Sequence, residues 1–437
     1  MSLVSSMYTG ASGLQTLSTS IEVISNNISN VNTVGFKAGR AEFQDLLSQS
    51  LGDSQVGRGV TLDAISSTFA QGSFQNTSIS TDLAISGEGF FILSDGISEY
   101  YSRAGEFRFN AEGTLVNPNG LLVQGYQYDN NGNNLGVVGE INFANLSSTP
   151  KMTETITVGQ NLDATGDTNV FDAADPVNTS NFSTTVTVYD SLGSSHTVTV
   201  YYNKTGDNTW EWNATVDPDE VTTALVDPDD LVIEGGSGTL IFNEDGSLQN
   251  TEAIPPTGAT VAPSATFDFA GGATANQTIA FNFGTPTLAD LSGGTGLDGT
   301  TQFASDSVIN FQSQDGYPTG NLQGLEIDQD GVVTGIFSNG RSREIAQIAI
   351  ATFTNNNGLK KSGGNLYLST IASGDATVTQ PNTGAAGAIS SNTLELSNVD
   401  LTNEFVNMIT TQRGFQASSR VISTSDEMLN EIVNLGR

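Results

Sequence analysis

The sequence predicts a mixed, mainly β fold, with coiled-coil-like α-helices at both ends and two β domains between them, one nested as an insertion in the other. Three observations support this prediction. Apolar residues recur at heptad spacing only near the termini, alternating apolar and polar residues fill the middle, and an acidic stretch separates two similar β segments. The composition agrees, because 48 glycines and a charged fraction of 14% are typical of turn-rich β structure.

The first expected element is an N-terminal helix that ends near residues 30–35. Its apolar residues follow each other in steps of three and four, which is a heptad seam. Asparagines then compete for backbone hydrogen bonds and Gly35 permits unusual backbone angles, so we expect the chain to turn there. The seam residues are Leu3, Met7, Leu14, Leu17, Ile21, Ile24, Ile28 and Val31.

A second seam recurs every seven residues near the C-terminus, with Ser397 and Asp400 available as helix caps. Each apolar seam must be buried against another surface. It can pack against the other seam or against another copy of the chain. Alternatively, the two helices form an ordinary appendage that packs on a domain of the same chain. Gly414 within this helix costs roughly 1 kcal/mol relative to Ala, so close approach of another helix is a hypothesis for it. The seam residues are Leu394, Leu401, Phe405, Met408, Phe415, Ile422, Leu429 and Val433.

The middle of the chain is expected to form strands. A short helical pattern at Phe43 and Leu46 precedes them. Three segments share one turn pattern with Gly at a position of positive φ, and each predicts a tight hairpin. They are "FNAEGTL" at 109, "FNEDGSL" at 242 and "IDQDGVV" at 327.

Composition and pattern together define the expected domains. The stretch 148–317 holds 23 acidic and two basic residues, so it carries −21 of the chain's net charge of −33 and is expected to be a separate acidic β domain. The expected domains are a terminal helical domain (1–32 and 394–437), a connecting segment (33–72 and 371–393), a β domain (73–147 and 318–370) and the inserted β domain (148–317).

The residue content argues against several functional classes. With only 14 Lys and Arg residues and a net charge of −33, the chain has too few basic side chains to form a nucleic-acid-binding surface. The absence of cysteine rules out disulfides and thiolate metal sites. His196, the single histidine, is expected to be a surface strand residue, because one imidazole without partners supports neither a triad nor a zinc site. We therefore predict no catalytic, cofactor-binding or metal-binding residue and no enzyme activity. The alternative from another class is a secreted, monomeric β-rich protein that binds or hydrolyses glycans.

The N-terminus lacks the positive segment and apolar run of a secretory signal, and no stretch reaches the ~18 apolar residues of a membrane span. No membrane insertion is expected. A cytoplasmic location and a leaderless export route both agree with this pattern.

Two terminal motifs resemble the bacterial flagellar axial proteins, a family of rod, hook and hook-associated proteins. The motifs cover residues 12–37 and 397–435. Inside the chain, "YDSLGSSHTVTVYY" and "SQDGYPTGNLQGLEIDQDGVVTGIF" resemble the hook branch in particular, whereas the distal rod branch, the alternative, lacks so large an inserted domain. The matching N-terminal signature residues are Asn26, Asn27, Asn30, Asn32, Thr33, Gly35, Phe36 and Lys37.

The resemblance implies a structural subunit that assembles with itself into a curved, flexible tube, which transmits torque from rod to filament as a universal joint. It implies terminal helices in an inner tube, β domains outside, an extracellular position in the flagellar hook and basal body, and type III export without a cleaved signal peptide. The implied partners are the distal rod, hook cap and hook–filament junction proteins and the export apparatus, and no cofactor is implied.

Self-assembly leads to further expectations. Many copies would cover seams that one helix pair covers only in part, so the termini should be disordered or marginal in the free chain. Contacts between the acidic domains should depend on salt. Phe36 and Phe43 should anchor the helices on the β layers, with ordinary core burial as the alternative. Four basic residues are expected to form ion pairs with Glu22, Glu42 or Glu404 of neighbouring copies: Lys37, Arg40, Arg413 and Arg420. The alternative is that they lie on solvated helix faces.

Overall fold

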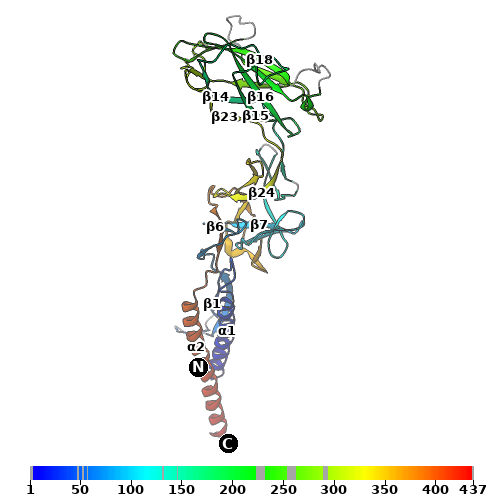
Figure 1. Ribbon diagram of the computed structural model, residues 1–437. Coiled ribbons are helices and arrows are strands. Elements are labelled where there is room, and N and C mark those ends of the chain that lie inside the picture. Colours follow the sequence, from blue (N-terminus) through cyan, green and yellow to red (C-terminus); the bar gives the residue numbers. More distant parts are fainter. Residues whose placement is uncertain are drawn as a thin grey trace. The chain divides into compact units, whose positions relative to one another are not determined.

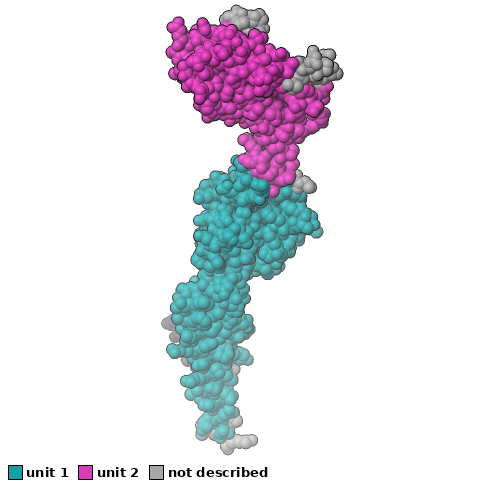
Figure 2. Space-filling model, viewed as in Figure 1, with its two compact units in different colours: residues 1–146, 323–336, 342–437 teal, residues 147–322, 337–341 magenta. Residues whose placement is uncertain are grey.

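The protein consists of two compact units, coloured separately in Figure 2. Unit 1 comprises residues 1–146, 323–336 and 342–437, and unit 2 comprises residues 147–322 and 337–341. A mainly β chain with a helix near each end confirms the predicted fold class (Figure 1). The computed structural model describes residues 3–46, 49–51, 54–56, 58–129, 132–144, 146–222, 232–252, 262–288 and 294–435.

The two helices of unit 1 are α1 (Leu3–Ser29) and α2 (Leu401–Leu435), at opposite ends of the colour scale in Figure 1. α1 ends where the asparagines gather, and the chain turns through Gly35 at a φ of +67°, as predicted. Asp400 caps α2, because its Oδ1 accepts a hydrogen bond from the backbone N–H of Thr402 at 2.8 Å.

Leu394 lies outside α2, so its assignment to the helical seam was wrong. It belongs to strand β32 (Thr393–Glu395), which pairs with β5 (Phe74–Asn76), and its side chain is only 8% exposed. Leu394 fits the heptad spacing because it is apolar, as buried strand residues also are. Its partner strand, β5, is too distant in sequence for periodicity to reveal the pairing.

The prediction of a short helix near Phe43 and Leu46 was also wrong. Residues there form β1 (Gly39–Asp45), which pairs with β4 (Val60–Ser67) as an antiparallel hairpin. The returning strand satisfies the backbone hydrogen bonds, which overrides the weak local pattern. Phe43 is exposed and is therefore no packing anchor.

The β part of unit 1 is built on one sheet with the strand order β24-β25-β26-β11-β7-β8-β29-β28. Phe90, Ile92, Tyr101 and Tyr367 form a core on this sheet. Its strands, including those off the main path, are β7 (Phe90–Ser94), β8 (Glu99–Ser102), β9 (Arg108–Phe109), β10 (Leu115–Val116), β11 (Leu122–Tyr128), β12 (Asn134–Glu140), β24 (Gly320–Ile327), β25 (Val332–Phe337), β26 (Ser342–Ile348), β27 (Ile350–Thr352), β28 (Lys360–Gly363), β29 (Leu366–Leu368) and β30 (Thr377–Thr379). Smaller pairs join β2 (Gln49–Leu51) to β3 (Ser54–Val56) and β6 (Leu83–Ser86) to β31 (Ala388–Ser391).

Unit 2 is a β-sandwich, because two five-stranded sheets share one apolar core. Trp210 and Trp212 lie fully buried at its centre, and the indole Nε1 of Trp210 donates to Gln302 Oε1 at 2.8 Å. One sheet contains β14 (Thr155–Asp163), β20 (Ser264–Phe267), β21 (Gln277–Asn282), β22 (Thr301–Phe303) and β23 (Val308–Gln314). The other contains β15 (Phe182–Tyr189), β16 (Ser195–Gly206), β17 (Thr209–Val216), β18 (Ile233–Phe242) and β19 (Leu248–Glu252). β13 (Ser147–Ser148) pairs with Gly320 and Asn321, the first residues of β24, which also belong to unit 2.

His196 is buried in unit 2, so the expectation of a surface residue was wrong. Its ring stacks on Phe269 with a centroid distance of 4.0 Å, and its nitrogens face Asp190 at 3.3 Å and Glu220 at 3.4 Å. Asp190 lies in the turn between β15 and β16, whereas Glu220 ends a short 3-10 helix (Pro218–Glu220) and Phe269 lies still farther along the chain, so periodicity does not reveal that the three residues meet.

Candidate assembly surface

The helix pair is held together by small residues on facing sides. A Cβ placed on Gly10 would lie 2.9 Å from Cγ1 of Ile422, and one on Gly414 would lie 3.4 Å from Cδ1 of Leu17. This confirms the hypothesis that Gly414 marks a close helix approach. Because Gly10 meets the distal part of α2 and Gly414 meets Leu17 farther along α1, the two helices run antiparallel.

The helix pair leaves much of its apolar surface uncovered within one chain. Phe405 is 50% exposed and Ile409 is 49% exposed. Gly414 faces α1, and Phe405 and Ile409 lie roughly 180° and 140° around the helix from it, so both are on the side of α2 turned away from α1. The seam residues Leu401 and Phe415 are also exposed. Ile24 is buried, and the remaining described seam side chains are half-buried, namely Met7, Leu14, Leu17, Ile21, Ile28, Val31, Met408, Ile422 and Leu429. The side chains of Leu3 and Val433 lie outside the described residues.

The N-terminal signature residues form the junction between α1 and the β part of unit 1. Asn27 is buried, and its amide bonds both backbone groups of Gly39, accepting from N–H and donating to C=O at 2.8 Å each. Asn30 donates to the backbone oxygen of Asn26 at 2.8 Å, which closes the last turn of the helix. Thus Asn27 docks strand β1 on α1, while Asn30 ends the helix.

The rest of the signature follows the chain into the β part. The hydroxyl of Thr33 donates to Oδ1 of Asn30 at 3.1 Å, and Asn32 is exposed. Gly35 lies directly against the backbone of Ala104, so a side chain has no room there in addition to its positive φ. Phe36 is buried, which agrees with a packing anchor at this junction.

Lys37 is buried in a charge cluster inside unit 1, so the expected ion pair with a neighbouring copy was wrong. Its Nζ lies 2.6 Å from Glu395 Oε1 and donates to the backbone oxygen of Ala70 at 2.9 Å. Arg103 lies 3.5 Å from the second oxygen of Glu395, and the backbone N–H of Gly72 donates to Oε1 at 2.8 Å. Burial lowers the pKa of Lys37, and Glu395 opposes that shift by hydrogen bonding and by charge.

Sequence reasoning missed Glu395 and Arg103 as parts of this junction. Glu395 lies in a short strand, where a charged residue is normally assigned to the solvent face. Asn398 was missed as well, although it accepts from the backbone N–H of Ala38 at 2.8 Å and donates to the backbone oxygen of Thr68 at 2.7 Å. The only available signal was the position of Glu395 and Asn398 directly before the predicted helix.

Models of four protein families together match most of the chain. The matching models are "Flagella basal body rod protein" (residues 7–37), "Flagellar hook protein FlgE/F/G D1 domain" (84–166), "Flagellar basal body protein FlaE D2 domain" (161–317) and "Flagellar basal body rod FlgEFG protein C-terminal" (390–435). The terminal models therefore coincide with the two helices and the junction, and the D2 model lies within unit 2.

Individual relatives match over nearly the full length of both chains. The flagellar hook protein FlgE of Treponema pallidum is 37% identical over 100% of this chain and 100% of its own. FlgE of Salmonella typhimurium is 35% identical over 97% of this chain and 98% of its own. The crystal structure of Helicobacter pylori flagellar hook protein FlgE2 matches 74% of this chain with a TM-score of 0.45 and 15% identity, and all of that chain is covered. On the strength of the two full-length sequence matches, this chain belongs to the family of flagellar hook proteins.

Proposed function

We propose that the chain is a structural subunit of the bacterial flagellar hook, which polymerises with copies of itself into a curved, flexible tube and transmits torque as a universal joint. The observation that carries this proposal is the exposed apolar side of α2, which includes Phe405 and Ile409. Fully burying a side chain of this size is worth roughly 1.5–3 kcal/mol. In a chain whose full-length relatives are hook proteins, sister subunits are the partners that gain this energy.

The two units suit different contacts in such a tube. The helix pair offers apolar surface for tight contacts, whereas the −21 charge of residues 148–317 favours loose contacts that screening by salt can adjust. A bending tube needs both kinds, because some contacts must hold while others open and close in each turn.

Position and partners follow from the same proposal. The chain would lie in the extracellular flagellum, having left the cell through the type III export apparatus without a cleaved signal peptide, and would contact the distal rod, hook cap and hook–filament junction proteins. None of the helices in the described part of the chain is long and apolar enough to cross a membrane. Across the described residues, no group of three or more His, Cys, Asp or Glu side chains that could hold a metal ion occurs.

Electron microscopy of the purified chain after salt-induced polymerisation tests this function. We expect curved tubes. Straight tubes would instead indicate a rod-type subunit, and a chain that stays monomeric at every salt and protein concentration would contradict the proposal.

A further inference from the structure

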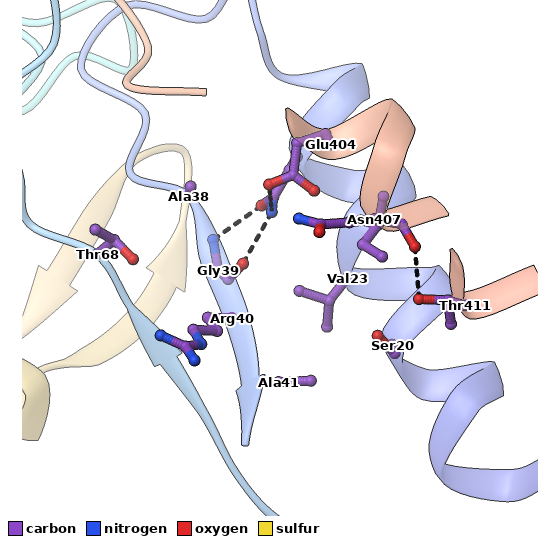
Figure 3. A pocket seen from close by; sticks show the side chains of 12 residues that line it. Ser20, Val23, Ala38, Gly39, Arg40, Ala41, Thr68, Glu404, Asn407 and Thr411 are labelled. Carbon is purple, nitrogen blue, oxygen red and sulfur yellow. Dashed lines mark hydrogen bonds between the residues drawn. The ribbon is translucent and has the colours of Figure 1, made fainter. Parts of the chain in front are cut away.

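A polar cavity of about 440 Å³ lies in unit 1 between α1, the start of α2 and strand β1 (Figure 3). Hydroxyl and amide groups from α1, from α2 and from Thr68, which follows β4, surround it, and one carboxylate, that of Glu404, lines it. The polar residues that the argument uses are Ser20, Asn27, Arg40, Thr68, Glu404 and Asn407.

Glu404 is incompletely bonded in this cavity. Its Oε1 accepts a hydrogen bond from Asn27 Nδ2 at 3.2 Å, but its Oε2 is buried and has no hydrogen-bond partner among the described residues. Asn27 has no donor left, because its Nδ2 also serves the backbone oxygen of Gly39. Burial raises the pKa of Glu404, the Asn27 bond opposes this, and the charge of Asp400 adds to it. A buried carboxylate oxygen without a donor is costly, so the cavity is incomplete in one copy.

A guanidinium is the group that fits this cavity best. A single carboxylate is a poor metal site, whereas a planar fork of N–H donors could serve Oε2, once the Glu404 side chain rotates to expose it, together with the nearby hydroxyl and amide oxygens. Arg40 of the same chain lines the cavity, but it forms no ion pair with Glu404 in the described structure, and Figure 3 shows its guanidinium turned away from that carboxylate.

The helix pair itself supplies the candidate guanidinium groups. α1 contains no Lys or Arg, and α2 contains only Arg413 and Arg420, both exposed and without an ion pair to any described residue. They are seven residues apart and so share one side of the helix. Arg413 lies nine residues after Glu404, which is about half a turn around the helix and roughly 13 Å along it. Neither arginine can therefore reach the cavity of its own chain.

We propose that, in the assembled tube, an arginine from α2 of a neighbouring copy, Arg413 or Arg420, enters this cavity and pairs with Glu404. This inference rests on the self-assembly proposed above and identifies one of its contacts. Phe405 and Ile409 lie on the same side of α2 as the two arginines, so the contact that buries the apolar side chains also excludes water from the ion pair. In the assembled tube, the side chain that fills the cavity therefore comes from another copy of the chain.

Polymerisation of the full chain tests the inference, with the critical concentration measured by sedimentation and the tubes checked by electron microscopy. Glu404→Gln keeps an oxygen for Asn27 but removes the charge, and we expect it to raise the critical concentration about tenfold or more. Glu112→Gln removes an exposed charge from the turn between β9 and β10 and should change the value less than about twofold. Unchanged thermal unfolding of the β units in both variants shows that each is folded.

A charge swap identifies the partner. Glu404→Arg, Arg413→Glu and Arg420→Glu should each impair polymerisation. Combining Glu404→Arg with the correct arginine reversal should restore it by at least tenfold relative to Glu404→Arg alone, because every contact then pairs opposite charges again. The inference is overturned if Glu404→Gln behaves like Glu112→Gln, or if neither double variant improves on Glu404→Arg. A wild-type chain that forms no tubes contradicts the proposed function itself, which separates the two failures.

Discussion

At the scale of single residues, Glu395 is the group on which the helix–sheet junction depends most. It compensates two buried cations, Lys37 and Arg103, and it anchors the backbone N–H of Gly72. Replacing Glu395 by Gln would remove the carboxylate that forms an ion pair with both cations, and breaking a buried ion pair in this way costs about 3–5 kcal/mol. We therefore expect Glu395→Gln to lower the free energy of unfolding of unit 1 by that amount, as measured by denaturant titration.

Lys360→Met is the matched control, because Lys360 is exposed on strand β28 of the same unit. It should leave the denaturant midpoint nearly unchanged. If Glu395→Gln has no larger effect than this control, the charge cluster does not stabilise the junction.

In unit 2, the lowered pKa of Asp315 leads us to predict that the free energy of unfolding depends on pH. Burial raises its pKa, but hydrogen bonds from Lys151 Nζ and from the backbone N–H groups of Thr155 and Glu154 outweigh burial, so the pKa lies below its usual value. As pH falls below about 3.8, the unfolded chain takes up the proton first, so the stabilisation is present above that pH and is lost below it.

Thermal unfolding of unit 2 between pH 5 and pH 2.5 measures this effect. Asp315→Asn should show a flatter pH profile than the wild type, whereas Asp207→Asn, which changes an exposed acid, should run parallel to it. Parallel profiles for all three proteins would show that Asp315 contributes no such stabilisation.

Residue roles were predictable only where one local signal determined them. Asp400 was identified as a cap, because its neighbours in sequence determine that role. Lys37 and His196 were assigned to the surface, yet Lys37 is buried beside Glu395 from the other end of the chain, and His196 is buried between Asp190 and Glu220 and stacks on Phe269. Their burial depends on tertiary partners that composition and periodicity do not contain.

At the scale of secondary-structure elements, the close contact of α1 with α2 predicts a strong effect of bulk at Gly10. A larger side chain there must displace Ile422 of α2. Overpacking of this kind costs about 1–3 kcal/mol, which corresponds to a rise of roughly 5- to 150-fold in the critical concentration for polymerisation. Ser18→Leu on the exposed side of α1 provides the control, since it adds the same side chain without blocking α2. Equal values for Gly10→Leu and Ser18→Leu would contradict this packing.

The half-covered helices predict a difference in amide exchange between the free and assembled chain. In a dilute monomer, residues of α1 should exchange far faster than those of β7, because an isolated helix pair with exposed apolar sides is marginal. In tubes, the exchange of α1 should slow to that of the core strands. Strong protection of α1 in the dilute monomer would show that sister copies are not needed to fold it.

Elements with strong local signals were predicted well. The three shared turn segments form hairpin turns, with Gly113, Gly246 and Gly331 at φ values of +74°, +83° and +74°. The end of α1 and the cap of α2 also agreed with prediction. The strand at Leu394 and the hairpin at Phe43 did not, because pairing between segments decides their structure and local periodicity does not report it.

At the scale of the whole molecule, the acidic insertion predicts salt-dependent assembly. Residues 148–317 carry a net −21, and the Debye length falls from about 30 Å at 0.01 M to about 8 Å at 0.15 M salt. Repulsion between copies should therefore weaken over this range, and the critical concentration should fall. Neutralising three exposed acids of unit 2 (Asp207→Asn, Glu244→Gln and Asp306→Asn) should reduce this dependence. An identical salt response in wild type and triple variant would show that this charge does not limit assembly.

Thiol labelling tests the central claim most directly, because the chain contains no cysteine and a single one can be introduced without background. Val406→Cys places it on the apolar side of α2, where Val406 is 54% exposed, and Ile97→Cys places a reference on a fully exposed loop of unit 1. The account predicts that, on polymerisation, labelling at position 406 slows at least about tenfold relative to position 97. Equal labelling rates at position 406 in monomer and tube would show that sister subunits do not bury this surface, and would contradict the account.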